Sequence, residues 1–400
     1  MRTNDFFAQI LQIQAPFSIH RIEYRDDEAS KVGKSVHIEV QVDTGSAYRP
    51  ENSVLKDYEV RTWRHLNMFQ YPCYITCRVP KYKSKLTGKT KTMVVPWAAQ
   101  GSGFTLLFEE FAIELVKLYG CVAEVARQID IYPQRLWKVV HAYGEQTSLD
   151  QIDRSKVRKI GFDETSKKKG HSYITCFIDL ETGDLLYIVE GKSSEAVADF
   201  ATQMKQQNLD TAHVTQVSID MSPAFIAGAE ANFPNAQITF DKFHVSQLLQ
   251  KAFDSVRKAI GRKEKGGTIN KWIFFKPYDS LKAEEQDQLD GLLMKYPDLA
   301  TAYRIKNEFQ RLWQMPDKLE ASAWLSFVAD VMRSLKKRAA TTLANSFDKH
   351  HQRIINVIET KITNALLEGF NSKVQTLKRK ARGYRDVENL KLMIRLHCSS

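Results

Sequence analysis

Three acidic residues, far apart along the chain, have the type and setting expected of a cation-binding site. Asp163 and Asp220 each follow a short apolar run, and Glu368 lies where apolar residues recur with helical spacing. Enzymes that cleave phosphodiesters with two divalent cations gather carboxylates from distant segments, because the cations lie about 3.5–4 Å apart. Taken singly, each acid is more often a turn residue or an exposed helical side chain. Their joint occurrence predicts that Asp163, Asp220 and Glu368 are catalytic and hold two magnesium or manganese ions.

The elements expected around the first two acids form a mixed sheet. Apolar runs predict strands, and Gly183 supplies the permissive residue of a hairpin turn. In order we expect a strand, a hairpin, a helix capped by Ser193 or Ser194, and two more strands, at 160–163, 173–189, 193–204, 214–220 and 238–241. Neighbouring strands would bring Asp163 and Asp220 to one edge of the sheet. A hairpin followed by a crossover to a second acid-bearing strand is the skeleton of a ribonuclease-H-like core.

The third acid is expected on an amphipathic helix. That helix is predicted by the spacing of four apolar residues, Ile362, Ala365, Leu366 and Phe370. Asn364 and Asn371 lie three or four residues on either side of Glu368, hence on nearly the same helical face. The preceding segment, about 242–355, has helical periodicity without strands. We interpret it as a helical insertion.

A candidate helix-turn-helix precedes the first acid. A helix over 104–118 is predicted to bury Leu107, Phe111, Leu115 and Leu118 and to end at Gly120. Two short helices follow, and the second begins at Pro133 with a buried stripe of Leu136, Val139 and Val140. It would present three side chains to a DNA groove, those of Gln134, Arg135 and Lys138. From this segment alone, DNA binding and a plain packing unit both remain open.

The charge balance favours a polyanionic partner. Lysine and arginine number 58 against 47 acids, a formal charge of +11, and neutralised phosphates release counterions on binding. A basic stretch follows Glu368 and could grip a DNA backbone, although such runs are commonly solvated surface; its members are Lys373, Lys378, Arg379, Lys380 and Arg382. Five scattered cysteines predict no disulfide framework and a reducing compartment. With no signal-peptide core and no apolar run of about 20 residues, we expect a cytoplasmic protein without membrane contact.

Several strings together resemble the DDE transposases of bacterial insertion sequences, and more narrowly the ISL-three family. They include 95–98 with 101–105, the helix-turn-helix, Asp163 with Glu164, 220–223, 240–244 and 368–373, in order through nearly the whole chain. The resemblance implies a ribonuclease-H-like core with Asp163, Asp220 and Glu368 as the metal-binding triad. Asp241 and His244 match a further family string, which implies an accessory role near the site. The resemblance also implies binding to terminal inverted repeats by at least a homodimer.

Residues 1–100 have strand periodicity, as in Ile38, Val40 and Val42 on one face. The family carries a zinc-binding module here, but in this chain Ser84 and Thr87 stand where the later cysteine pair is expected. A structural zinc site needs about four N or S ligands, and the remaining candidates do not supply four: His65, Cys73 and Cys77. We therefore expect a zinc-ribbon-like module that keeps its fold without zinc, with the two cysteines as buried thiols.

The resulting prediction is an α+β multidomain protein. The expected parts are a β-rich zinc-ribbon-like module at 1–100 and a helix-turn-helix at 101–150. An α/β catalytic core follows in two segments, 151–245 and 351–400, with the helical insertion at 246–350 between them. The predicted function is a transposase that binds terminal inverted repeats of double-stranded DNA, cleaves them and joins them to target DNA. The alternatives are a stand-alone nuclease of the same fold and a domesticated DNA-binding protein without catalysis. A bacterial, nucleoid-associated location is expected.

Overall fold

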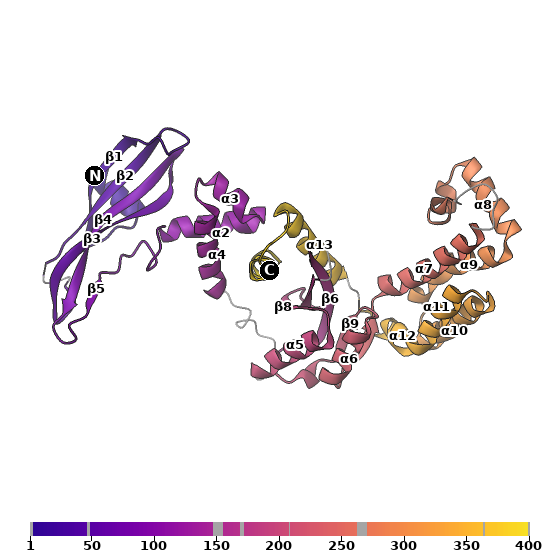
Figure 1. Ribbon diagram of the computed structural model, residues 1–400. Coiled ribbons are helices and arrows are strands. Elements are labelled where there is room, and N and C mark those ends of the chain that lie inside the picture. Colours follow the sequence, from indigo (N-terminus) through magenta and orange to yellow (C-terminus); the bar gives the residue numbers. More distant parts are fainter. Residues whose placement is uncertain are drawn as a thin grey trace. The chain divides into compact units, whose positions relative to one another are not determined.

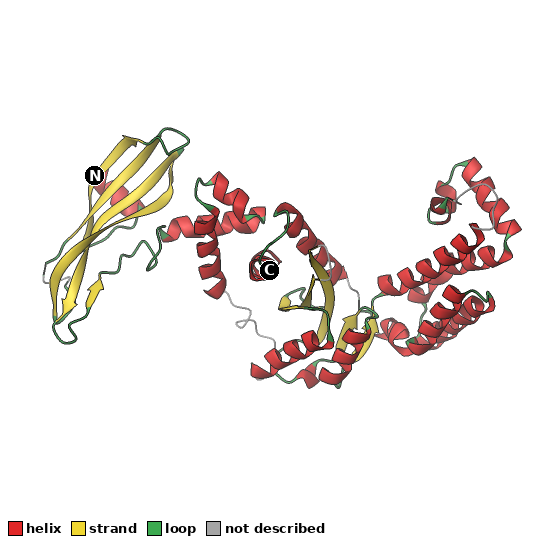
Figure 2. Ribbon diagram, viewed as in Figure 1, coloured by secondary structure: helices red, strands yellow, loops and turns green. Residues whose placement is uncertain are grey.

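The computed structural model describes residues 3–45, 49–146, 155–168, 172–207, 209–261, 270–362 and 365–398. The chain folds into two compact units, the first covering residues 1–148 and the second nearly all of the remainder (Figure 1). Both units combine helices and strands (Figure 2), so the predicted α+β class is confirmed. Among the described residues, no helix combines the length and apolar character needed to cross a bilayer.

The N-terminal part of the first unit is a short helix followed by a five-stranded sheet. Helix α1 (Thr3–Ile10) precedes five strands, β1 (Phe17–Asp26), β2 (Lys34–Val42), β3 (Ser53–Met68), β4 (Tyr71–Ser84) and β5 (Thr90–Thr92). The order is β1-β2-β4-β3, with β5 paired to β4; only the β2–β4 pair is parallel. Ile38 and Val40 are buried and Val42 is half-buried. The predicted strand periodicity and β-rich character are therefore confirmed.

The cysteines of this sheet belong to its hydrophobic core. Cys73 and Cys77 are buried free thiols beside Trp63, and burial raises the pKa of each thiol to about 12. His65 pairs with Cys73 across the strands, but its Nδ1 is hydrogen-bonded to Thr105 Oγ1 at 2.9 Å. Metals bind the thiolate rather than the thiol. This setting is that of packed core residues, whereas the likeness to a zinc ribbon stays a prediction.

Three helices complete the first unit, α2 (Leu106–Tyr119), α3 (Val122–Gln128) and α4 (Pro133–Gln146). Thr105 caps α2, and Gly120 ends it with φ 69° as predicted. The predicted buried face of α2 is wrong. Leu107, Phe111 and Leu118 are exposed and Leu115 is half-buried, whereas the buried residues are Phe108, Ala112, Ile113 and Val116. The helix carries two apolar stripes, and packing against α3, α4 and β3 buries the second one.

The second unit contains the mixed sheet predicted around the acids. Its strands are β6 (Lys159–Lys168), β7 (Ser172–Asp179), β8 (Leu185–Glu190), β9 (Gln216–Ile219) and β10 (Gln237–Phe240), in the order β10-β9-β6-β7-β8. The β6–β7 and β7–β8 pairs are antiparallel, and the β6–β9 and β9–β10 pairs are parallel. Gly183 forms the hairpin turn with φ 83°. Strand β6 does not end at Asp163 as predicted, because its pairing with β7 continues to Lys168.

Helices surround this sheet and extend into the predicted insertion. The α-helices are α5 (Ser194–Gln206), α6 (Pro223–Asn232), α7 (Lys242–Gly261), α8 (Ala283–Lys295), α9 (Pro297–Glu308), α10 (Lys318–Ser334), α11 (Arg338–Lys349), α12 (His351–Thr360), α13 (Ala365–Lys380) and α14 (Val387–Cys398). Short 3₁₀ turns lie at Thr211–His213, Lys271–Phe274, Tyr278–Ser280 and Phe309–Gln314. The described residues between β10 and α13 contain no strand, in agreement with the periodicity.

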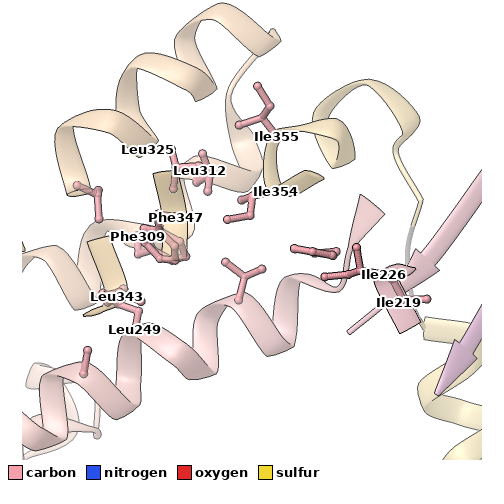
Figure 3. Packing of buried hydrophobic residues seen from close by; sticks show 14 of the residues in the cluster. Ile219, Ile226, Leu249, Phe309, Leu312, Leu325, Leu343, Phe347, Ile354 and Ile355 are labelled. Carbon is pink, nitrogen blue, oxygen red and sulfur yellow. The ribbon is translucent and has the colours of Figure 1, made fainter. Parts of the chain in front are cut away.

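One hydrophobic core runs from the sheet into these helices. Ile219 of β9 and Ile226 of α6 lie beside a group of helical side chains that includes Phe309 and Phe347 (Figure 3). Those two rings stack with centroids 5.6 Å apart. The buried Asn356 of α12 donates from Nδ2 to the Ile238 carbonyl of β10 at 2.8 Å. The helical segment is therefore packed onto the sheet by apolar and polar contacts alike.

We expect Phe347→Ala to lower the free energy of unfolding by about 3–5 kcal/mol, because a fully buried ring leaves a cavity. Urea denaturation followed by circular dichroism measures the change. Phe327→Ala, which removes a ring that is 46% exposed, is the matched control and should cost much less. Equal losses in the two variants would contradict the packing described above.

Candidate functional site

Three aspartates lie side by side at one edge of the parallel part of the sheet: Asp163 is on β6, and Asp220 and Asp241 directly follow β9 and β10. Gly161 of β6 pairs with Ser218 of β9, so the same register carried two residues further sets Asp163 beside Asp220. Ile219 pairs with Phe240, which sets Asp220 beside Asp241, the residue after β10. The predicted meeting of Asp163 and Asp220 therefore follows from strand pairing, and the sheet adds a third acid to the row.

Backbone amides hold one oxygen of each aspartate. Asp163 Oδ1 accepts from Glu164 N at 2.8 Å, and Asp220 Oδ1 accepts from Ser222 N at 2.9 Å. Asp241 Oδ1 accepts from Phe243 N at 3.0 Å, while its Oδ2 is hydrogen-bonded to His244 Nδ1 at 2.7 Å. These bonds fix the orientation of the three carboxylates, and the amide bonds to Asp163 and Asp220 favour the ionised form of those two acids.

A tight cluster of acidic oxygens forms at this row. Ligand atoms of Asp163, Glu164 and Asp220 all lie within 4.8 Å of one another. Hard cations such as Mg²⁺ are bound by carboxylate oxygens, so the donor set fits a divalent cation. Glu164 was not among the predicted ligands. The adjacent acids in the motif at Asp163 were the sequence signal that could have identified it.

Glu368 lies on the wall of the same pocket. This pocket has a volume of about 380 Å³ and is lined by Phe162, Asp163, Asp220, Asp241, Phe243, His244, Leu367, Glu368 and Asn371. Glu368 is an exposed residue in the first turn of α13 and is not part of the 4.8 Å cluster. The pocket therefore gathers all three predicted catalytic acids together with the predicted accessory pair, Asp241 and His244.

Asn371 reaches from α13 to the first acid. Its Nδ2 donates to Asp163 Oδ2 at 2.8 Å, whereas its Oδ1 is buried and has no hydrogen-bond partner among the described residues. A buried polar atom without a partner costs about 1–3 kcal/mol. Asn364, predicted for the same helical face, lies outside the described residues.

Burial and like charge shift the titration of the site. Burial, with a further contribution from Asp220, raises the pKa of Asp163 to about 6. Burial likewise raises the pKa of Asp220, and the hydrogen bond with Asp241 raises the pKa of His244. The ionised carboxylates therefore carry a free-energy cost that a bound cation would relieve.

The helix-turn-helix presents the side chains predicted for DNA contact. Leu136, Val139 and Val140 are buried as expected, and the exposed face of α4 bears Gln134, Arg135 and Lys138. Arg135 also makes a cation–π contact within its own unit, because its guanidinium lies 4.3 Å from the centre of the Phe104 ring.

The turn between α3 and α4 is held by the sheet of the same unit. Lys31 Nζ donates to the Arg127 carbonyl at 2.6 Å and pairs with Asp130 at 2.9 Å. Asp130 has a φ of 58°, which the tight turn requires. The lysine thereby fastens the turn to the β1–β2 connection.

The predicted basic stretch divides into two kinds of residue. Lys373, Arg379, Lys380 and Arg382 are exposed. Lys378 instead donates from Nζ to the Ser166 carbonyl of β6, and burial lowers the pKa of this lysine. Its bond to β6 is a packing contact within the second unit.

We expect Asp163→Asn to stabilise the metal-free protein at pH 7.5 and to lose that advantage in acid. Folding raises the pKa of Asp163 from 3.8 to about 6. The stability that Asp163 contributes to the wild-type protein is therefore fully present below pH 3.8 and is lost as pH rises through 6. The difference in unfolding free energy should approach about 3 kcal/mol above pH 7. Thermal unfolding in chelator at pH 7.5 and pH 4.5 measures it. A gap independent of pH, or one shared by the exposed-site control Asp287→Asn, would refute this account.

Comparison with known proteins places the chain in a family. A family model described as "Transposase" matches residues 160–394, and one described as "Helix-turn-helix domain of transposase family ISL3" matches residues 94–144. The chain is 28% identical over 260 residues to the transposase for insertion sequence element IS1001 of Bordetella parapertussis, spanning 62% of this chain and 63% of that protein, less than two thirds of its length. It is 23% identical over 444 aligned positions to the transposase for insertion sequence element IS1557 of Mycobacterium tuberculosis. That alignment spans 98% of this chain and 94% of the relative. Since the transposase model alone covers more than half of the chain, the protein belongs to the ISL3 family of DDE transposases.

Proposed function

We propose that this protein cuts the ends of an insertion sequence and joins them to target DNA, with Asp163, Asp220 and Glu368 as the catalytic, metal-binding residues. The observation that carries the proposal is the gathering of these acids, from three distant segments, in one pocket. The relatives are named as transposases for insertion sequence elements, which supports the same reaction here.

The sheet supports assigning a ribonuclease-H-like core. From β8 through β7 and β6 the strands are antiparallel, and from β6 through β9 and β10 they are parallel. The first acid lies on the central strand and the second directly after its parallel neighbour, the arrangement expected from the hairpin and crossover. The helices α7 to α12 then form the insertion that separates Glu368 from the other two acids.

Two magnesium or manganese ions would supply charge stabilisation at the scissile phosphate and activation of the attacking oxygen. In this proposal Asp163 and Asp220 would hold the ions from the sheet and Glu368 would hold them from α13, while Glu164 would offer a further oxygen. Water attacks phosphorus, the bond to the 3′ oxygen breaks, and that oxygen leaves as a 3′-hydroxyl. The freed 3′-hydroxyl then attacks a phosphodiester of the target and displaces its 3′ oxygen.

The pair formed by Asp241 and His244 is assigned an accessory role. Asp241 Oδ2 is hydrogen-bonded to Nδ1 of the imidazole, and His244 lines the pocket. A histidine fixed in this way can exchange a proton with a reacting oxygen or donate a hydrogen bond to phosphate. Asp241 thereby sets the orientation of the ring.

DNA recognition is assigned to two groups of residues. Gln134, Arg135 and Lys138 of α4 would contact the terminal inverted repeats through the major groove. The exposed basic residues that follow Glu368 would hold the phosphate backbone near the cut, namely Lys373, Arg379, Lys380 and Arg382, with Lys378 at the edge of this group. Pairing two element ends requires at least a homodimer on DNA.

We expect Asp163→Ala, Asp220→Ala and Glu368→Ala each to abolish magnesium- or manganese-dependent cleavage of DNA that carries the element's terminal repeats. Binding to that DNA should persist, because none of these acids lies in the helix-turn-helix. Gel assays of cleavage and of strand transfer measure the two reactions, and Asp287→Ala, which alters an exposed acid of α8, is the control.

The same assays distinguish the alternatives. Cleavage without strand transfer would indicate a stand-alone nuclease. Sequence-specific binding without cleavage by the wild-type protein, under either metal, would indicate a DNA-binding protein that has lost catalysis.

We expect Gln134→Ala and Lys138→Ala to weaken DNA binding in different ways. An amide that contacts a base edge contributes about 1–3 kcal/mol of discrimination, so Gln134→Ala should relax specificity for the repeat. Lys138→Ala should weaken binding to every sequence and reduce the salt dependence by about one phosphate contact. Fluorescence anisotropy at several salt concentrations, on repeat and scrambled DNA, measures both. Unchanged affinity in both variants would exclude this face of α4.

A further inference from the structure

Asn371 joins the helix of the third acid to the strand of the first. It follows Glu368 by three residues on α13, so the two side chains share a helical face, and both line the pocket. Its Nδ2 donates to Asp163 Oδ2 at 2.8 Å across 208 residues of sequence. The opposite oxygen of Asp163 is held by the backbone amide of Glu164. The Asp163 carboxylate is therefore fixed from both sides, and α13 supplies one of the two donors.

A second contact between the same two elements sets their register. Lys378 Nζ donates to the Ser166 carbonyl. Seven helical residues from Asn371 to Lys378 rise about 10.5 Å, and three strand residues from Asp163 to Ser166 rise about 10 Å. The matching lengths allow α13 to run beside β6 with a polar contact at each end. Val374, which lies between these two contacts on α13, is fully buried.

The asparagine is a poor choice for stability alone. Its Oδ1 is buried without a partner among the described residues, and a buried acceptor left unpaired destabilises the folded state. A leucine of similar size would fill the same space without that penalty. The benefit of the amide must therefore lie in the bond that it makes with Asp163.

We propose that Asn371 is the positioning residue of the cation site. Its amide orients the Asp163 carboxylate, and, together with Lys378, it holds α13 in the register on β6 that places Glu368 on the pocket wall. This inference rests on the proposed function, because the site that Asn371 serves is the proposed metal site. Residues that orient metal ligands typically change metal affinity by 10- to 100-fold when they are removed.

The test compares Mn²⁺ binding with stability in the full-length protein. We expect Asn371→Leu to reduce the Mn²⁺ affinity measured by calorimetry about tenfold or more, with little change in thermal stability in chelator, because losing the bond to Asp163 and removing the unpaired Oδ1 have opposite effects. Asn371→Ala should weaken Mn²⁺ binding in the same direction. In cleavage assays the Mn²⁺ concentration for half-maximal rate should rise by the same factor, and the rate at saturating Mn²⁺ should fall less. Ser372→Ala, which alters the exposed neighbour on α13, is the matched control and should resemble the wild type.

Two results would overturn the inference alone. One is wild-type Mn²⁺ affinity in Asn371→Leu while Asp163→Ala loses binding. The other is a drop in thermal stability that accounts for the lost affinity, which would make Asn371 an ordinary packing residue. If the wild-type protein itself binds no Mn²⁺, the proposed function fails, and the inference fails with it. Mn²⁺ binding by the wild type and by Asp163→Ala therefore shows whether the proposed function fails or only the role assigned to Asn371.

Discussion

The parallel pairing of β6 with β9 and of β9 with β10 forces aspartates into adjacent positions. The second unit can fold only if other contacts offset the cost of bringing these acids together. Burial disfavours the ionised form of these acids and like charges add a smaller repulsion, and the pKa values of Asp163 and Asp220 are raised as a result. Backbone amides after each strand, the amide of Asn371 and the imidazole of His244 offset part of that repulsion. The site is thus held ready for a cation by hydrogen bonds that are already formed.

Much of this arrangement could be predicted from the sequence because it depends on local pattern. The apolar runs predicted the strands β6, β9 and β10. Because Asp163 and Asp220 directly follow two of these runs, they were expected at the same edge of the sheet. The hydrogen bond from Asn371 to Asp163 could not be predicted, since it depends on how α13 lies against β6. The closeness of Glu164 to Asp220 was signalled only by the adjacent acids at 163 and 164. The buried face of α2 was assigned wrongly for a related reason. A helix with two apolar stripes does not reveal which one its neighbours will cover.

The helices between β10 and α13 are part of the same hydrophobic core as the sheet, not an appendage to it. Asn356 ties α12 to β10 through a buried hydrogen bond, and Phe309 stacks on Phe347 deeper among the helices. The chain therefore returns from the insertion along a path fixed by packing. The first turn of α13 then lies next to the acids, so that Glu368, far along the sequence, lines the same pocket as Asp163.

The order of these elements along the chain also determines when each capability arises during synthesis. Domains fold largely from the N-terminus as they are made. The helix-turn-helix is complete by Gln146, whereas Glu368 lies in the last tenth of the 400 residues. A ribosome-bound chain can thus hold a folded first unit while the third carboxylate has not been translated. Premature termination before α13 would therefore yield a chain that has the whole helix-turn-helix and lacks Glu368.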